Sequence, residues 1–351
     1  MVCALEKYAG FRAELAIAET LEELLLIENK AAAIAEFGRK DKIGLAEQNQ
    51  WGKFRIEIEA KKGAWLEQKF PQGGDRKSSS TKGELDFLLK DIGITANESA
   101  NARLVLRESE LVSEAMEAIE NKQKVITPSL VAKEVRNLKK IITRKENEEK
   151  GKKIELPEII DFRLGDFEDV LADIPNSSVD CIITDPPYPI EFIECWTKLA
   201  RFAKCKLKPN GFCIAYSGQM NLPEVIKRMD QHLDYYWTFA LYLEGQTQIV
   251  NGVNLICRWK PVLIYQNGKK KIATTIQDYI ISDCREKEHH DWQQGKTGVM
   301  KLIEQFTNRG DLIVEPFAGG GTTIKAAVEL GRNIIAAEID ETMYFIAKAA
   351  L

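Results

Sequence analysis

The stretch Leu312-Ile-Val-Glu-Pro-Phe-Ala-Gly-Gly-Gly-Thr-Thr323 decides the fold. Its first three residues have the pattern of an apolar strand, the glycines form a turn, and a helical pattern continues to Leu330. A strand, a glycine-rich loop and a helix start, in this order, turn backbone N–H groups and the positive end of a helix toward a ligand. The stretch therefore predicts an α/β fold with a binding site for a carboxylate or a phosphate.

Two common classes of glycine-rich loop do not fit this stretch. It has no Lys in the P-loop position, and it lacks the third glycine of the dinucleotide pattern G-x-G-x-x-G. The next strand pattern, residues 333–337, ends at Glu338, about 20 residues after the loop, where an acid can accept hydrogen bonds from ribose hydroxyls. The loop and this acid together indicate a ligand that contains adenosine.

A second turn whose residues suit binding or catalysis, Asp185-Pro186-Pro187-Tyr188, directly follows the apolar run 179–184. The two prolines fix an extended backbone and offer no donor, so the Asp185 carboxylate and the Pro186 carbonyl become rigidly placed acceptors. A planar amino group with two hydrogens fits such a pair. Tyr188 adds an aromatic face on which a nucleobase can stack.

Strand and helix patterns alternate through the C-terminal half, which predicts a largely parallel sheet covered on both faces. A helix is expected at 192–206 and a turn at 208–211. In such folds ligands bind at the carboxyl ends of strands. The expected strands are 160–165, 179–184, 211–216, 237–243, 261–265, 312–314 and 333–337.

The combination of Asp-Pro-Pro-Tyr and Phe-x-Gly-x-Gly-Thr-Thr resembles the S-adenosylmethionine-dependent DNA amino-methyltransferases. The turn at Asp185 precedes the loop at Phe317, which is the circularly permuted order of the β class. The resemblance covers residues 157–351 and implies a Rossmann-like, mostly parallel methyltransferase sheet. It is closest to the N6-adenine type and phage-like, with an additional N-terminal helical domain.

The resemblance also implies roles for individual residues. Asp185, Pro186, Pro187 and Tyr188 would hold and activate the target amine of a flipped-out base. Only 13 residues follow Glu338, so the remaining strand is expected upstream, at 160–165, with Asp166 near the cofactor's adenine. The residues expected to bind S-adenosylmethionine are Asp166, Glu315, Phe317, Gly319, Gly321, Thr322 and Glu338.

Two further segments resemble the family less closely. Trp259-Lys-Pro261 is similar to a block that precedes a strand and the recognition region. Residues 290–299, which include His290, Gln293 and Lys296, resemble a segment that closes over the methionine end of the cofactor, but its usual prolines are missing. His289 and His290 are better explained as polar surface residues. Only a short insert, 269–291, remains for target recognition, which suggests that the N-terminal helices read the DNA sequence.

The expected reaction is methyl transfer to adenine N6 in double-stranded DNA, as in restriction-modification. N4-cytosine methylation remains an alternative, although Ser is more usual there at the first position of the turn. RNA or protein amide methylation and a catalytically silent DNA-binding regulator are further alternatives. The intact residues Asp185, Tyr188 and 319–322 disfavour the silent regulator.

The chain divides near residue 153 into a helical domain, 1–153, and a methyltransferase domain, 154–351. Ala, Glu, Lys and Leu dominate the first part, with apolar residues at helical spacing and a Gly/Ser-rich loop at 71–83. Gly93 is expected to end one helix, Thr95 to cap the next, and Thr127-Pro128 to start another.

Residues 94–131 resemble the helix-turn-helix regions of ParB-type partition proteins and of small phage DNA-binding modules. An ordinary helical bundle explains the same pattern. The adjacent stretch 131–153 carries nine basic and four acidic residues, a net charge of +5, which would suit contact with phosphates. A charge run of this kind can also be a solvated helix face.

The composition narrows the class of protein. The 351 residues are 44% hydrophobic and 29% charged with a net charge of -4, so any nucleic-acid contact must come from a local patch. No apolar run would span a membrane and no signal peptide is seen. Seven scattered cysteines suggest a reducing, cytoplasmic location, and three histidines without partners at zinc spacing give no reason to expect a metal. A homodimer remains open.

Overall fold

The computed structural model describes residues 2–40, 44–70, 89, 91, 93–244, 248–250, 253–269, 271–272, 275–283 and 295–351. The chain forms two compact units, Met1–Thr143 and Arg144–Leu351. This division lies ten residues before the boundary predicted from composition, because helix α7 (Pro128–Lys153) belongs to both units. In the second unit Gly151 of α7 touches α13, where an added Cβ would lie 1.8 Å from the carbonyl oxygen of Phe345. The domain assignment of residues 144–153 stays a prediction.

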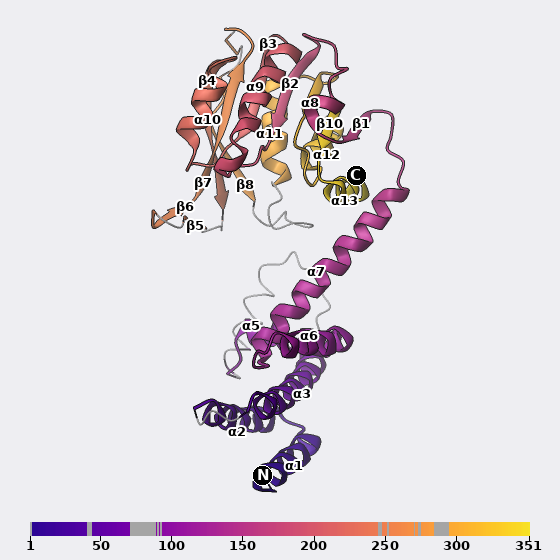
Figure 1. The fold of residues 1–351 in the computed structure, drawn as a ribbon, viewed down its shortest axis with the longest axis vertical. Helices are drawn as coiled ribbons and strands as arrows, with labels where there is room; N and C mark the ends of the chain where they lie inside the picture. Colours follow the sequence, from indigo (N-terminus) through magenta and orange to yellow (C-terminus); the bar gives the residue numbers. More distant parts are fainter. Residues whose placement is uncertain are drawn as a thin grey trace. The chain divides into compact units, whose positions relative to one another are not determined.

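The first unit is helical, as the sequence predicts (Figure 1). Its apolar side chains, among them Phe54, Leu66 and Ile119, pack into three buried clusters between the helices. Besides the first part of α7, its helices are α1 (Val2–Ile17), α2 (Leu21–Lys40), α3 (Leu45–Lys69), α5 (Ala96–Arg107) and α6 (Ser109–Asn121).

Both predicted helix starts in this unit are confirmed. Thr95 caps α5: its hydroxyl accepts the N–H of Glu98 at 3.2 Å, and the Glu98 carboxylate accepts the N–H of Thr95 at 2.8 Å. Gly93 has φ of +76°, the left-handed conformation expected at a helix end. Helix α7 begins at Pro128. The predicted loop 71–83 lies outside the described residues.

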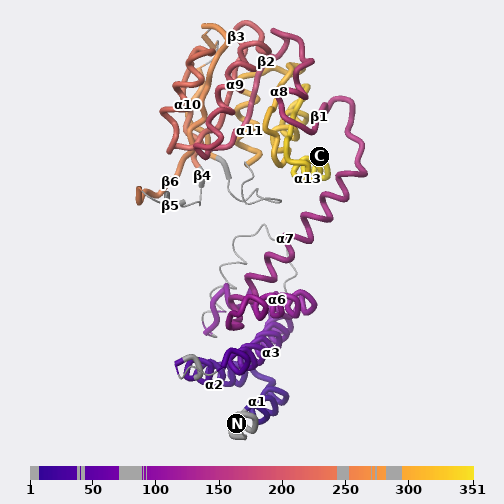
Figure 2. Tube along the Cα trace, in the orientation of Figure 1, coloured from indigo at the N-terminus to yellow at the C-terminus, as the bar shows by residue number. Residues whose placement is uncertain are grey.

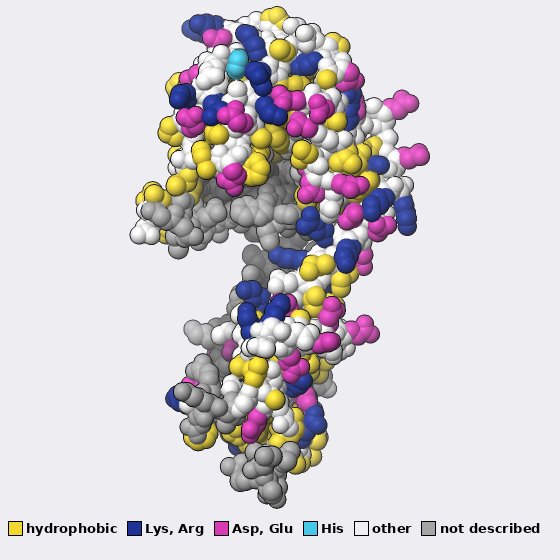
Figure 3. All heavy atoms as spheres, in the orientation of Figure 1, with side chains coloured by type: hydrophobic (Ala, Val, Ile, Leu, Met, Phe, Trp, Pro, Cys, Tyr) yellow, Lys and Arg dark blue, Asp and Glu magenta, His cyan; other side chains and the backbone are white. Residues whose placement is uncertain are grey.

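In the segment predicted to resemble a helix-turn-helix, one residue, Glu108, separates α5 from α6, and residues 122–127 lead into α7. Val105, Ile119 and Val131 from the three helices share one core. Dark blue Lys and Arg side chains follow α7, with acids among them (Figure 3). DNA reading by this segment stays a prediction.

The second unit is built on an eight-stranded sheet of order β1-β10-β9-β2-β3-β7-β4-β8. The first five strands in this order are parallel, β7 is antiparallel to β3 and β4, and β8 is parallel to β4. The predicted Rossmann-like, mostly parallel fold is confirmed. The strands are β1 (Ile160–Leu164), β2 (Val179–Thr184), β3 (Leu207–Tyr216), β4 (Asp234–Glu244), β7 (Trp259–Gln266), β8 (Tyr279–Asp283), β9 (Leu312–Glu315) and β10 (Asn333–Glu338).

Helices cover both faces of this sheet (Figure 1). Alternating strand residues explain the two layers, since Ile183 packs with α11, α12 and α13, whereas Ile182 packs with α8, α9 and α10. The helices are α8 (Phe167–Val170), the 3-10 turn η1 (Ile190–Phe192), α9 (Glu194–Lys206), α10 (Leu222–Met229), α11 (Lys296–Phe306), α12 (Thr322–Glu329) and α13 (Glu341–Ala350).

Three local predictions need correction. The turn expected at 208–211 lies within β3, as an irregularity in the pairing with β2, where the register passes from Val179↔Leu207 to Cys181↔Phe212. Trp259-Lys-Pro261 does not precede a strand but begins β7. The strands β8, β5 (Gln248–Val250) and β6 (Leu255–Cys257) were not expected; β5 and β6 form a separate two-stranded sheet.

The strand predicted upstream is confirmed as β1, which pairs in parallel with β10 from Ile160↔Ile334 to Leu164↔Glu338. Figure 2 shows the β1 trace beside the yellow C-terminal segments. Among the described helices, none combines the length and the apolar character needed to cross a membrane.

Candidate active site

The two turns singled out in the sequence meet at one edge of the sheet. Strand β2 lies beside β9 in parallel, with Cys181 opposite Ile313 and Ile182 opposite Val314. The turn Asp185–Tyr188 therefore leaves the sheet next to the loop 316–321. This is the carboxyl edge, where ligands bind in open α/β sheets.

Hydrogen bonds to the end of β10 hold the glycine loop on one side, and its other side is open. Ala318 donates its N–H to the Ala337 carbonyl at 2.9 Å, and Gly319 donates to Glu338 Oε2 at 2.7 Å. Gly319 and Gly321 have φ of +50° and +76°, where side chains are strained. A Cβ added at Gly319 or Gly320 would meet nothing within 4 Å, so the loop leaves room for a ligand.

Glu338 acts as the support of this loop. Its second oxygen, Oε1, accepts the N–H of Asp340 at 2.8 Å. Burial raises the pKa of Glu338, and the two backbone donors oppose that rise. The acid predicted to bind ribose thus lies at the end of β10 beside the loop, with backbone hydrogen bonds already on both oxygens.

Glu315 lies deeper than the sequence suggests. Its side chain is 2% exposed, and its Oε1 accepts a hydrogen bond from the Thr184 hydroxyl and another from the Phe317 N–H, the latter at 3.1 Å. Burial raises the pKa of Glu315 to about 8, against the hydrogen bonds from Thr184, Phe317 and Thr323, which lower it. The neutral carboxyl joins the ends of β2 and β9, and so positions both turns.

Two more of the expected cofactor residues complete the loop. Thr322 is buried at the first position of α12, directly after the left-handed cap Gly321. The Phe317 ring lies 5.1 Å from that of Phe167, which begins α8 after β1. The glycine loop therefore contacts the segment that carries Asp166.

Asp166 lies after β1, at the same edge of the sheet. It caps α8 by accepting the Glu168 N–H at 3.0 Å, and its carboxylate lies 3.9 Å from the Lys198 ammonium. At Gly165 a Cβ would lie 2.5 Å from the Val170 side chain, so glycine permits this turn. The Asp166 side chain is about one third exposed and remains accessible to a ligand.

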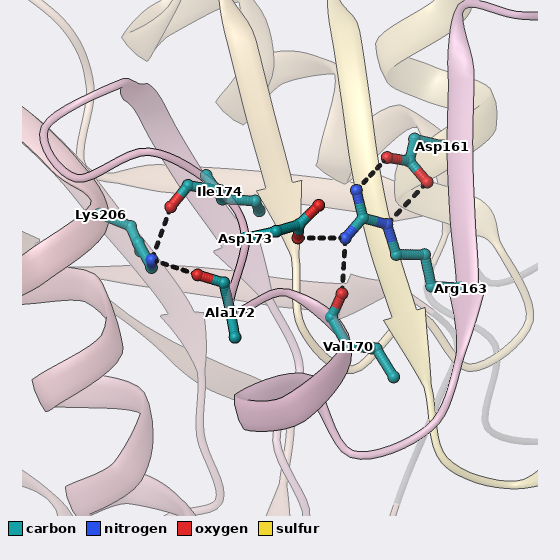
Figure 4. Close-up of polar contacts among 7 residues, drawn as sticks. All are labelled: Asp161, Arg163, Val170, Ala172, Asp173, Ile174 and Lys206. Carbon is teal, nitrogen blue, oxygen red and sulfur yellow. Dashed lines mark hydrogen bonds and ion pairs between the residues drawn. The ribbon is translucent and has the colours of Figure 1, made fainter.

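Figure 4 shows how the segment after β1 is anchored. Arg163 donates to both oxygens of Asp161, at 2.9 and 2.5 Å, to the Val170 carbonyl at 2.6 Å, and to Asp173. Lys206, from the end of α9, donates to the carbonyls of Ala172 and Ile174. A guanidinium with this many acceptors fixes the segment's backbone, so the position of Asp166 is set before any ligand arrives.

The Asp185–Tyr188 turn is closed on itself. The Tyr188 hydroxyl donates a hydrogen bond to Asp185 Oδ1, and burial, followed by the Asp185 charge, raises the pKa of Tyr188. Asn221 donates to the Tyr188 carbonyl at 2.9 Å, while Pro186 is buried. The Asp185 side chain remains 29% exposed, which leaves it accessible to a substrate.

Sequence reasoning missed Lys260 as a member of this site. The Lys260 ammonium lies 3.8 Å from Asp185 Oδ2 and 4.9 Å from the centroid of the Tyr188 ring. Its neighbours Trp259 and Pro261 marked the segment in the sequence, but the antiparallel insertion of β7 next to β3 carries Lys260 to the turn. No pattern within one segment shows such a contact.

The segment expected to close over the cofactor is only partly visible. His289, His290 and Gln293 lie outside the described residues. Lys296 begins α11 and forms an ion pair with Glu329 of α12. Within the described part of the chain, no group of three His, Cys, Asp or Glu side chains is placed to hold a metal ion.

Residues 179–349 match the family model described as DNA methylase, N6_N4_Mtase. The chain is 25% identical over 199 residues to a candidate methylase, YubD, of Escherichia coli (strain K12), across 51% of this chain and 85% of YubD. It is 23% identical over 229 residues to the type II methyltransferase M.HpaI of Haemophilus parainfluenzae, across 52% and 70% of the two chains. The solved M1.HpyAVI-SAM complex aligns with 23% identity and a TM-score of 0.47, across 55% of this chain and 100% of that one.

Proposed function

We propose that this chain, whose residues 179–349 belong to the N6/N4 family of S-adenosylmethionine-dependent DNA methyltransferases, methylates the N6 amine of adenine in double-stranded DNA. The observation that carries the proposal is the position of Asp185. Its partly exposed carboxylate begins the Pro-Pro-Tyr turn, next to the open glycine loop.

The residues at the carboxyl edge fit the cofactor. The loop offers open space above Gly319 and Gly320, and Glu338 and Asp166 are carboxylates at the ends of the two adjacent strands. We assign Glu338 to the ribose, Asp166 to the adenine edge, and the loop with Phe317, Gly319, Gly321 and Thr322 to the methionine end. Glu315 supports the loop from beneath. S-adenosylmethionine supplies an electrophilic methyl group bound to a sulfonium.

Asp185 and the Pro186 carbonyl each accept one N–H of the target amine. These two hydrogen bonds draw the nitrogen lone pair out of conjugation with the ring and favour the tetrahedral nitrogen of the transition state. Asp185 is also placed to receive the proton that the methylated nitrogen releases. Positioning of the amine supplies most of the remaining rate enhancement.

The target base must leave the helix, because its amine is inaccessible within the duplex. Tyr188 then offers its ring to the flipped base. In the free protein the Tyr188 hydroxyl already occupies Oδ1 of Asp185, so the incoming amine exchanges with a hydrogen bond rather than meeting a bare carboxylate. A group that cannot donate a hydrogen bond would displace the Tyr188 hydroxyl without replacing its bond to Asp185, so such a group binds less favourably.

One experiment tests the reaction and its specificity. Full-length protein is incubated with duplex DNA and methyl-labelled S-adenosylmethionine, and the DNA is digested to nucleosides. We expect label in N6-methyl-2′-deoxyadenosine, and none when Asp185 is replaced by Ala. Label in N4-methyl-2′-deoxycytidine would show that cytosine and not adenine is the target, and absence of label across DNA of diverse sequence would refute the proposal.

A further inference from the structure

Lys260 connects the two ends of the Asp185–Tyr188 turn. Its ammonium lies near the Asp185 carboxylate and over the Tyr188 ring, at the 3.8 and 4.9 Å given above. The Lys260 side chain is only 21% exposed, and its residue pairs with Leu241 inside the sheet. A lysine held by a sheet backbone and partly removed from water is more than a mobile surface charge.

The two oxygens of Asp185 face different partners. Oδ1 accepts the Tyr188 hydroxyl, and Oδ2 faces the Lys260 ammonium. When a substrate amine takes the place of the tyrosine hydroxyl at Oδ1, Lys260 still restrains Oδ2. The carboxylate therefore keeps its orientation during the exchange.

Four titratable groups face Asp185 from the surrounding elements. Tyr188 comes from its own turn, Tyr216 from β3, Glu315 from β9 and Lys260 from β7. Burial raises the pKa of both tyrosines and of Glu315, so these three are neutral near pH 7. Lys260 is the member of this set that carries positive charge at neutral pH.

We propose that Lys260 is a positioning residue for methyl transfer, which fixes Oδ2 of Asp185 and the Tyr188 ring while the target amine binds at Oδ1. This inference rests on the proposed function. It predicts that the positive charge matters more than the side-chain shape, because the ammonium attracts the carboxylate and lies over the ring. Loss of that charge should leave Oδ2 of Asp185 unrestrained and slow transfer.

The test uses full-length Lys260→Met, Lys260→Arg and Lys269→Met. Lys269 is 84% exposed and lies near Asp234, away from the turn, so its replacement controls for the loss of one lysine charge. Single-turnover methylation is measured at pH 7 with saturating DNA, together with S-adenosylmethionine affinity and Tm. We expect Lys260→Met to slow transfer at least tenfold and to leave cofactor affinity and Tm unchanged.

Lys260→Arg should recover most of the rate, and Lys269→Met should match wild type. A wild-type rate in Lys260→Met would overturn the inference. Parallel losses of rate, Tm and cofactor affinity, or a loss of rate that Lys260→Arg does not relieve, would also overturn it, because they show a structural role. If Lys260→Met does not fold, the neutral and polar Lys260→Gln replaces it under the same criteria. An inert wild-type protein would refute the proposed function itself, and this inference with it.

Discussion

Glu338, the last residue of β10, accepts the backbone N–H of Gly319 at 2.7 Å. It thereby fixes the glycine loop that follows the neighbouring strand β9. The same carboxylate holds Asp340 at the start of α13. The loop is therefore shaped before a ligand binds, and less conformational freedom is lost on binding.

Replacing Glu338 by Gln should weaken cofactor binding. The amide has one acceptor oxygen for two backbone donors, Gly319 and Asp340, so one N–H loses its partner. We expect Kd for S-adenosylmethionine to rise at least tenfold, or about 1.4 kcal/mol. Titration calorimetry measures it, with the exposed Glu341→Gln as control. Equal affinity in the two variants would contradict this role.

Gly320→Val should separate cofactor binding from loop strain. A Cβ at Gly320 meets nothing within 4 Å, and no positive φ opposes a side chain there, so the fold should be retained. The valine fills the space above the loop, and we expect at least a tenfold loss of S-adenosylmethionine affinity with Tm unchanged. Gly319→Val adds the strain of its φ of +50° and should lose affinity and stability together. Unchanged affinity in Gly320→Val would place the ligand elsewhere.

Asp185→Ala should abolish transfer and leave cofactor affinity nearly unchanged, since this carboxylate faces the target amine in the proposed mechanism. The measurements are label incorporation into DNA and calorimetric cofactor binding. Asp234→Ala, at the start of β4, is the matched control. More than a few per cent of the parent rate in Asp185→Ala would exclude its role as the amine acceptor.

Glu315→Gln should change how stability depends on pH. Burial raises the pKa of Glu315 from 4.5 to about 8. Its favourable contribution to the free energy of unfolding is therefore fully present below about pH 4.5 and is lost as the pH rises through about 8. The neutral amide has no such dependence. Denaturant unfolding at pH 5, 7 and 9 should show the variant gaining stability relative to wild type as pH rises. A constant difference across this range would mean that the carboxyl is not held neutral.

Reversing the charge of three exposed residues of α7 tests DNA contact by this helix. The triple variant Lys133→Glu, Arg144→Glu, Lys145→Glu should bind duplex DNA more weakly, with a salt slope reduced by about 0.9 for each lost phosphate contact. The control for net charge is Lys204→Glu, Lys227→Glu, Lys269→Glu, because it replaces three exposed lysines of the second unit and changes the charge by the same amount. Identical affinity and slope in the triple variant and wild type would remove α7 from the DNA interface.

The sequence predicts the strands and the two turns well because each is marked locally. Apolar runs such as 179–184 end at Asp185, and the glycines at 319–321 mark a backbone that few side chains allow. The sequence also predicts the helix starts at Thr95 and Pro128 correctly, because a helix start depends on a few adjacent residues.

Contacts that depend on tertiary pairing are not visible in this way. Lys260 reaches Asp185 because β7 runs antiparallel beside β3. Glu315 is neutral because the core buries it, even though the hydrogen bond from Thr184 lowers its pKa. The segment 208–211 has turn residues but joins β3 since pairing with β2 overrides local preference.

The pairing of β1 with β10 affects how this domain forms. Ile160 and Ile334 are neighbours in the sheet but are more than 170 residues apart in the chain. On the ribosome, β1 emerges long before its partner, so the edge that carries Asp166 has no neighbour until synthesis reaches β10. Such non-local pairing is slow, because the entropy of closing a long loop is lost before the contacts form. The part of the site that carries Asp166 should therefore be completed last, and β1, which stands at the end of the sheet, needs protection from aggregation until then.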